Sequence, residues 1–178
     1  MKSKFLSLMI LILLTLSACS EEMNNDKGLI KVDIQGEFIT KIENEKILVV
    51  SNIPQDFSSS GGVKEYYNAT WLYNVESSDL KTLKIGQKVE YTTKGLTMTT
   101  YPGSVELDEI KIVKMKSPTT TNLTVEEVIR EAINRSPQIE VFILKDLTFD
   151  EDRQKWLVQF MDGLEKESKK MNLEINDH

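Results

Sequence analysis

The feature that most constrains the fold of this chain is a period-two alternation of apolar and polar residues, which recurs in short runs between residues 28 and 116. Successive side chains of a strand point to opposite faces of a sheet, so such runs predict β-strands. We assign strands to residues 34–42, 46–51, 69–75, 88–93 and 105–115. Five short strands with turn residues between them predict a small closed barrel or a sandwich.

Two local signals refine this assignment. Asn44 lies between the first two strands and predicts a tight turn, because Asn tolerates a positive φ angle. The apolar residues of the last strand change face near Asp108-Glu109, which indicates a β-bulge. The segments 36–51 and 83–91 resemble those of an OB-type five-stranded barrel. A simple antiparallel meander is the alternative.

The periodicity changes after a Ser/Thr/Pro linker at residues 117–122. Thr124 and Glu127 have the spacing of a capping box, which predicts the start of a helix. Apolar residues follow at helical spacing, and Pro137 ends the helix because the residue before a proline disfavours helical backbone.

Beyond this helix the chain predicts one strand and a second helix. Residues 139–144 are a short apolar run, and residues 150–171 carry apolar side chains at helical spacing. We therefore expect an α+β protein. Its β-barrel domain, residues 28–116, is followed by a helix–strand–helix segment, a helix-rich α/β appendage at residues 123–178.

The first 18 residues have the pattern of a bacterial signal peptide. Lys2 and Lys4 precede an apolar run at residues 5–16, which is too short to span a membrane as a helix. The run ends in Leu16, Ser17, Ala18 and Cys19, which resemble a bacterial lipobox. An ordinary secretory peptide with a chance cysteine is the alternative.

The lipobox makes Cys19 the predicted site of lipidation. Cleavage before this residue would make it the new N-terminus, and residues 19–27 would serve as a polar tether. Two or three acyl chains, palmitate among them, anchor a protein stably where one chain does not. We expect the membrane to be a partner through this lipid, with the protein on the extracytoplasmic face of the cell membrane.

Composition excludes several kinds of chemistry. Cys19 is the only cysteine, so no internal disulfide can form, and the only histidine is the last residue, His178, so the internal histidine that a Ser-His-Asp triad or a His-ligated zinc site needs is lacking. Without residues 1–18 the net charge is −8, which repels nucleic acid. We expect no metal, no cofactor, no catalytic residue and no nucleic-acid partner.

The motifs together also resemble a known family. The lipobox is followed by motifs at residues 36–50, 69–75 and 79–89 and by Tyr101-Pro102. Their order and spacing are similar to those of the YobA-like lipoproteins of Gram-positive bacilli, catalogued as domain of unknown function 3221. The resemblance covers about 28–116 and does not extend to residues 117–178. It implies a lipoprotein with a small β-domain and no assigned activity.

The residue pattern favours a binding or regulatory module of the cell envelope rather than an enzyme. Residues 55–62 form a Ser/Gly-rich loop, and loops on a rigid scaffold commonly carry function. Tyr66, Tyr67 and Tyr101 lie near it in our assignment and are the candidate binding residues for an envelope protein or a small ligand. A hydrolase that uses a carboxylate pair and a purely structural envelope protein are the alternatives.

Overall fold

The computed structural model describes residues 28–98, 100–165 and 169–178. The predicted signal peptide, the lipobox with Cys19 and the tether all lie outside the described residues.

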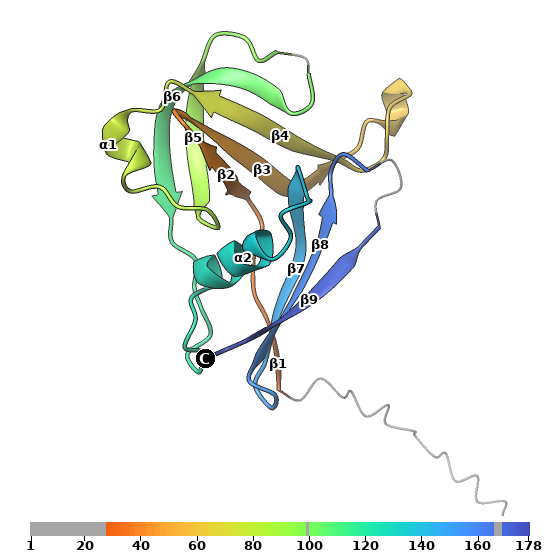
Figure 1. Cartoon of the computed structure of the whole chain (residues 1–178). Helices are drawn as coiled ribbons and strands as arrows, with labels where there is room; N and C mark the ends of the chain where they lie inside the picture. The colour runs from red at the N-terminus through yellow and green to blue at the C-terminus, as the bar shows by residue number, and fades with distance from the viewer. Residues whose placement is uncertain (1–27, 99, 166–168) are drawn as a thin grey trace, which may run out of the picture.

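The first half of the described chain is a closed five-stranded barrel, with the strand order β2-β3-β4-β6-β5 (Figure 1). The strands are β2 (Glu37–Glu43), β3 (Lys46–Gln55), β4 (Tyr66–Tyr73), β5 (Lys88–Lys94) and β6 (Gly103–Val113). Strands β4 and β6 pair in parallel, whereas the other barrel pairs are antiparallel. The parallel pair excludes the alternative of a simple meander.

Local sequence signals of the barrel are confirmed. Asn44 has a φ angle of 51° in the β2–β3 turn. Thr92 is opposite Glu109 and Thr93 is opposite Leu107, so Asp108 is left out of the strand register with β5 and forms the predicted bulge. A 3-10 turn, η1 (Ser58–Ser60), lies in the long β3–β4 loop, and a short helix, α1 (Ser77–Leu80), follows β4.

The second half of the described chain, together with β1 from its start, forms a four-stranded sheet in the order β1-β7-β8-β9. Its strands are β1 (Leu29–Lys31), β7 (Phe142–Asp150), β8 (Lys155–Asp162) and β9 (Met171–Asn176), and helix α2 (Val125–Asn134) precedes β7. The predicted barrel range 28–116 includes β1, but β1 pairs with β7 in this sheet. The prediction missed this because a pairing between residues 29–31 and 148–150 leaves no local signal.

The helix predicted over residues 150–171 is wrong, and so is the helix–strand–helix order. Trp156, Val158 and Phe160 alternate as buried residues of β8 and face the core, which is a period of two. The acidic residues at 150–152, which suit the first turn of a helix, instead form a β7–β8 hairpin turn. Asp150 accepts hydrogen bonds from the backbone N–H and the Nε of Arg153 in this turn.

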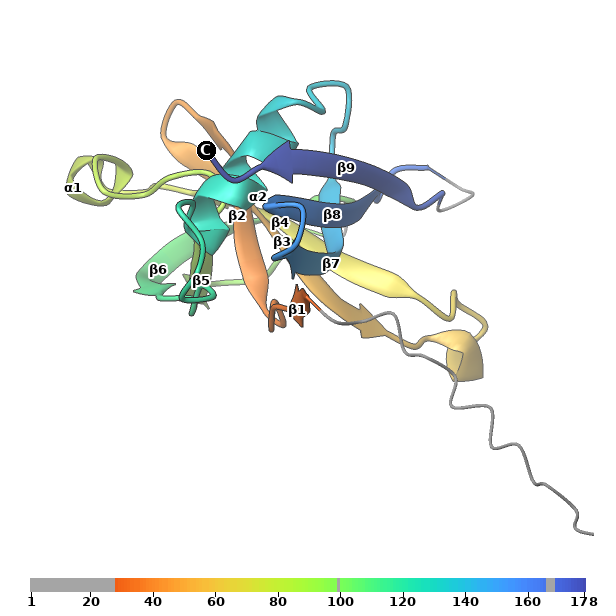
Figure 2. The same ribbon diagram turned by 90° about the horizontal axis from the view of Figure 1, so that it is seen from below.

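Helix α2 begins as predicted. The Thr124 hydroxyl accepts a hydrogen bond from the Glu127 backbone, and the Glu127 carboxylate accepts one from the Thr124 N–H. The hydrogen bonds that this carboxylate accepts from the Thr124 N–H and from the Thr124 hydroxyl lower the pKa of Glu127. The apolar side of α2 lies against β8 and β9, as Figure 2 shows from below. The core between them also takes in Val32, Ile34 and Phe38 from the start of the chain.

A second apolar contact joins the barrel to the sheet. Leu48 and Val50 of β3 and Ala69 of β4 form one cluster with Val141, Ile143 and Met161 of the C-terminal half. The two halves thus share buried side chains at two places, and the contact between β3 and β7 fixes the barrel against one end of the sheet.

Asp177 ties the C-terminus to the segment before α2. Its carboxylate accepts hydrogen bonds from the backbone N–H groups of Asn122 and Leu123 and from the indole of Trp156, at 2.7–2.9 Å. Burial by itself would raise the pKa of this carboxyl group, but the three bonds outweigh burial and lower the pKa. The buried side chain is therefore held as a charged acceptor.

Gly86, just before β5, permits a close backbone approach to α2. Its φ angle is +91°, and a Cβ atom there would lie 2.4 Å from the Glu126 carbonyl oxygen and 2.9 Å from the Arg130 nitrogen. Gly95 has a similar φ angle of +76°, but a Cβ atom there would meet no atom within 4 Å. The two glycines therefore separate backbone strain from steric overlap.

We predict that Gly86→Ala lowers the free energy of unfolding by about 3 kcal/mol, because left-handed strain and overpacking add. The control Gly95→Ala should cost about 1 kcal/mol, since only the strain applies. Urea unfolding of the full chain, followed by tryptophan fluorescence, measures both. Equal losses of unfolding free energy in the two variants would show that α2 moves enough to make room for a Cβ atom at Gly86.

Candidate functional site

A cleft of about 350 Å³ lies where the barrel meets the sheet. We call it the aromatic cleft. Tyr66 and Tyr101 form its walls, and Ile143 and Met161 line it from β7 and β8. Its remaining lining residues come from the β3–β4 loop, from β4 and from the segment after β8: Val63, Glu65, Tyr67, Gly163, Leu164 and Glu165.

Three aromatic rings stand side by side at the cleft. The ring centroids of Phe57 and Tyr66 are 5.5 Å apart at an interplanar angle of 69°, and those of Tyr66 and Tyr101 are 5.6 Å apart at 59°. Inclined rings at this spacing attract one another weakly through their quadrupoles. They also present ring faces that point in different directions.

The structure brings the three predicted tyrosines together, but they have different surroundings. Tyr66 and Tyr101 are half-buried at the cleft. Tyr67 is 3% exposed, so this candidate binding residue is buried and does not present its ring at the surface. Neighbouring residues of a strand point to opposite faces, and Tyr67 therefore points into the contact with Val141 and Ile143.

Lys145 is a residue of this site that the sequence analysis missed. It lies at a register shift in β7, between Leu144 and Asp146, and has no partner on β8. Its ammonium group is 4.2 Å from the ring centroid of Tyr67 and donates a hydrogen bond to the Tyr67 hydroxyl. It is also 3.7 Å from Glu65, and the Tyr67 hydroxyl donates to the same carboxylate at 3.1 Å. A lone lysine within a strand gives no sequence signal for this role.

Gly163 lets the Tyr101 side chain enter the junction. A Cβ atom at this position would lie 2.6 Å from the Tyr101 hydroxyl and 2.8 Å from a methyl carbon of Val141. Burial, with smaller contributions from the nearby Tyr66 and Asp162, raises the pKa of Tyr101 to about 12. Tyr101 therefore presents a neutral hydroxyl and a ring at neutral pH.

The rim of the aromatic cleft carries three exposed apolar side chains. Phe57, Val63 and Leu164 are 42%, 58% and 48% exposed. Large apolar side chains that gather around a hollow are typical of binding sites, whereas single exposed ones are common anywhere. Phe57 and Val63 of the β3–β4 loop are therefore apolar side chains that core packing does not account for.

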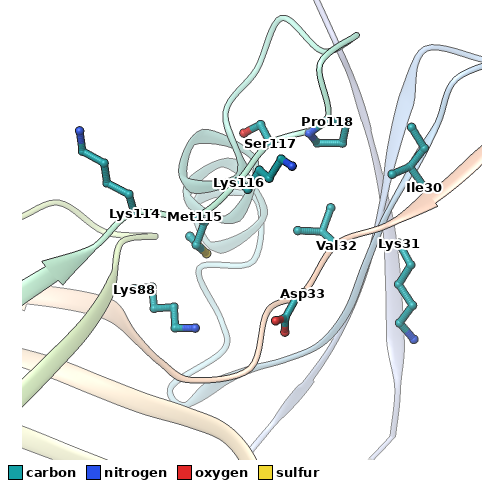
Figure 3. Close-up of a pocket in the computed structure, with 10 residues that line it drawn as sticks. All are labelled: Ile30, Lys31, Val32, Asp33, Lys88, Lys114, Met115, Lys116, Ser117 and Pro118. Carbon is teal, nitrogen blue, oxygen red and sulfur yellow. The ribbon is translucent and has the colours of Figure 1, made fainter.

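A second hollow, of about 370 Å³, is lined by four lysines (Figure 3). They are Lys31, Lys88, Lys114 and Lys116. Their side chains point in different directions in Figure 3, and Lys31 pairs with Asp146 at 2.9 Å. The four ammonium groups therefore do not surround one position that an anion could occupy.

A third hollow, of about 350 Å³, is acidic. Its carboxylates are Glu76, Asp79, Glu106, Asp108 and Glu109. Asp108 already pairs with Lys94 at 3.4 Å, and Glu76, Asp108 and Glu109 are exposed. Within the described ranges, no three Asp, Glu, His or Cys side chains are grouped so that they could hold a metal ion. Exposed carboxylates lack the apolar surroundings of a general acid, so the hydrolase alternative stays a hypothesis.

The barrel matches a known protein family. Residues 36–114 match the family model described as Protein of unknown function (DUF3221). The match begins one residue before β2 and ends one residue after β6, so it covers the barrel. It confirms the predicted resemblance to domain of unknown function 3221. No curated protein and no solved structure matches the chain.

Within residues 28–98, 100–165 and 169–178, no helix is both long enough and apolar enough to span a membrane.

We predict that Tyr67→Ala and Tyr66→Ala have different effects on stability. Tyr67→Ala should lower the free energy of unfolding by about 3 kcal/mol, because it removes a buried ring between barrel and sheet. Tyr66→Ala should cost about 1 kcal/mol, the value of one half-exposed aromatic contact. Urea unfolding midpoints of the two variants give the comparison. A Tyr66→Ala loss as large as that of Tyr67→Ala would make Tyr66 a core residue.

Proposed function

We propose that this protein is a membrane-anchored lipoprotein of the YobA-like kind, which binds a partner of the bacterial cell envelope through the aromatic cleft. The observation that carries the proposal is the cleft itself, where Tyr66 and Tyr101 meet under an exposed rim of Phe57, Val63 and Leu164. Tyrosine is enriched at recognition sites because it adds apolar area and a hydroxyl at small entropic cost. Two further observations support it.

The support for a lipid anchor comes from the sequence. Leu16, Ser17, Ala18 and Cys19 follow a short apolar run, and the only cysteine of the chain occupies the position that a lipobox requires. The mature chain carries a net charge of −8, which opposes binding to anionic headgroups. A lipid on Cys19 would therefore hold the protein at the extracytoplasmic face of the membrane.

The position of the binding surface follows from the barrel topology, which we propose is of the OB type. The strand order, the parallel pairing of β4 with β6 and the helix between β4 and β5 support this. OB barrels bind ligands on the face of their second and third strands, which correspond to β3 and β4. Here Val141, Ile143 and Met161 cover part of that face. The remaining open edge carries Tyr66 and Tyr101.

The anchor is tested by metabolic labelling with palmitate in a bacterial host. We predict that the full chain takes up the label and sediments with membranes, and that Cys19→Ala abolishes the label and releases the protein. Ser20→Ala, which changes the neighbouring residue outside the lipobox, should behave as the parent chain does. Label that persists in Cys19→Ala would refute lipidation at this residue.

The cleft is tested by site-specific photo-crosslinking in membranes that contain the full chain. We predict that a photoreactive residue at Val63 forms an adduct with a discrete partner, whereas one at Tyr73 does not. Tyr73 is also exposed and lies at the opposite end of β4 from Tyr66. Tyr66→Ala should reduce the Val63 adduct at least about fivefold, since hot-spot residues dominate binding. Equal amounts of adduct from Val63 and Tyr73 would refute the aromatic cleft as the binding site.

A further inference from the structure

The lining residues of the aromatic cleft include two carboxylates and no lysine or arginine, and this constrains what can enter it. Two of its lining residues, Glu65 and Glu165, are exposed carboxylates, and Asp162 lies directly before Gly163. The cation that the structure places beside Glu65 is Lys145, which is already bound to Tyr67. A cationic group is therefore attracted to the open side of the cleft, and an anionic group is repelled.

Two aromatic rings of β4, those of Tyr67 and Trp71, already hold lysine ammonium groups over their faces. Lys46 lies 4.3 Å from the ring centroid of Trp71, and Lys145 lies 4.2 Å from that of Tyr67. The face of an aromatic ring is negative and attracts cations at such distances. In the described part of the chain, no lysine or arginine occupies the rings of Phe57, Tyr66 or Tyr101 in this way. Tyr66 and Tyr101, which both line the cleft, are inclined to each other by 59°, and the face of such a ring can bind an ammonium group.

The cleft lies far from the point where the chain would leave for the membrane. Leu29 of β1 pairs with Asp150 at one end of β7, whereas Phe142 pairs with Asp162 at the other end. Gly163 of the cleft follows Asp162, so about 27 Å of strand separates the cleft from β1. Figure 1 shows β1 at the bottom of the sheet and the β3–β4 loop at the upper right. The cleft and the start of the described chain therefore lie at opposite ends of the sheet.

We propose that the aromatic cleft binds a lysine side chain of a basic polypeptide partner. The ammonium group lies between the rings of Tyr66 and Tyr101 and the carboxylates of Glu65 and Glu165. The aliphatic part of the side chain and the adjoining backbone pack on the exposed rim of Phe57, Val63 and Leu164, as lysine stems do on apolar surfaces. This inference rests on the proposed function and specifies the partner of that site.

The test is isothermal titration calorimetry of the full chain in a non-ionic detergent at low ionic strength. The probes are pentalysine, a peptide of five acetylated lysines and pentaglutamate. Acetylation keeps most of the apolar stem and removes the charge. We expect binding of pentalysine, at least tenfold weaker binding of the acetylated peptide, and no heat from pentaglutamate.

Variants locate the binding. Tyr66→Leu should weaken pentalysine binding about tenfold, and Glu165→Gln about threefold, because a ring face and a rim charge are lost. The matched controls Tyr73→Leu and Glu109→Gln, at an exposed aromatic and an exposed carboxylate elsewhere, should change it less than twofold. Glu165→Gln is exposed on the segment after β8, so it tests the cleft even where Tyr66→Leu fails to fold.

Two results would overturn the inference. If all four variants bind pentalysine alike, the peptide associates with the acidic surface in general. If the acetylated peptide binds as tightly as pentalysine, the cleft is an apolar site without preference for a cation. In either case a Val63 adduct that depends on Tyr66 would leave the proposed function standing, so the two proposals fail separately.

Discussion

The apolar contact between the barrel and the C-terminal sheet is the constraint on which the rest of this structure depends. Leu48, Val50 and Ala69 lie against Ile143 and Met161, and all five are nearly fully buried. Apolar burial contributes about 25 cal/mol for each Å² removed from water, so such a cluster holds two β-structures in one relative position. The contact places the loop before β4 next to the end of β8, and the aromatic cleft forms at its edge.

This packing also determines which side chains can act at the surface. Tyr67 and Lys145 satisfy one another inside the junction, so they stabilise the contact and leave little for a ligand. Tyr66, one residue away on the strand, points the other way and joins Tyr101 and Phe57 at the open edge. The alternation of side chains along β4 thus separates a buried tyrosine, Tyr67, from one at the open edge of the cleft, Tyr66.

Several elements were predictable because their causes are local. The Asn44 turn, the bulge at Asp108 and the capping box between Thr124 and Glu127 each depend on residues no more than a few positions apart. The grouping of Tyr66 with Tyr101 was partly predictable, since both were assigned near one long loop. Nothing in the sequence indicated that Lys145 and Gly163 complete the site, because each acts on residues from another part of the chain.

By itself, the sequence determined the alternation that makes the barrel strands, the turns between them and the start of α2. These follow from side-chain direction and backbone preference within short segments. The tertiary structure decided the conformation of residues 150–171, where apolar residues fit a helical spacing as well as a strand. Pairing of β8 with β7 and β9 satisfies its backbone on both sides and buries Trp156 and Phe160 under α2. The same long-range pairing places Leu29–Lys31 in the sheet and not in the barrel, and strand partners 117–121 residues apart leave no trace in the local sequence.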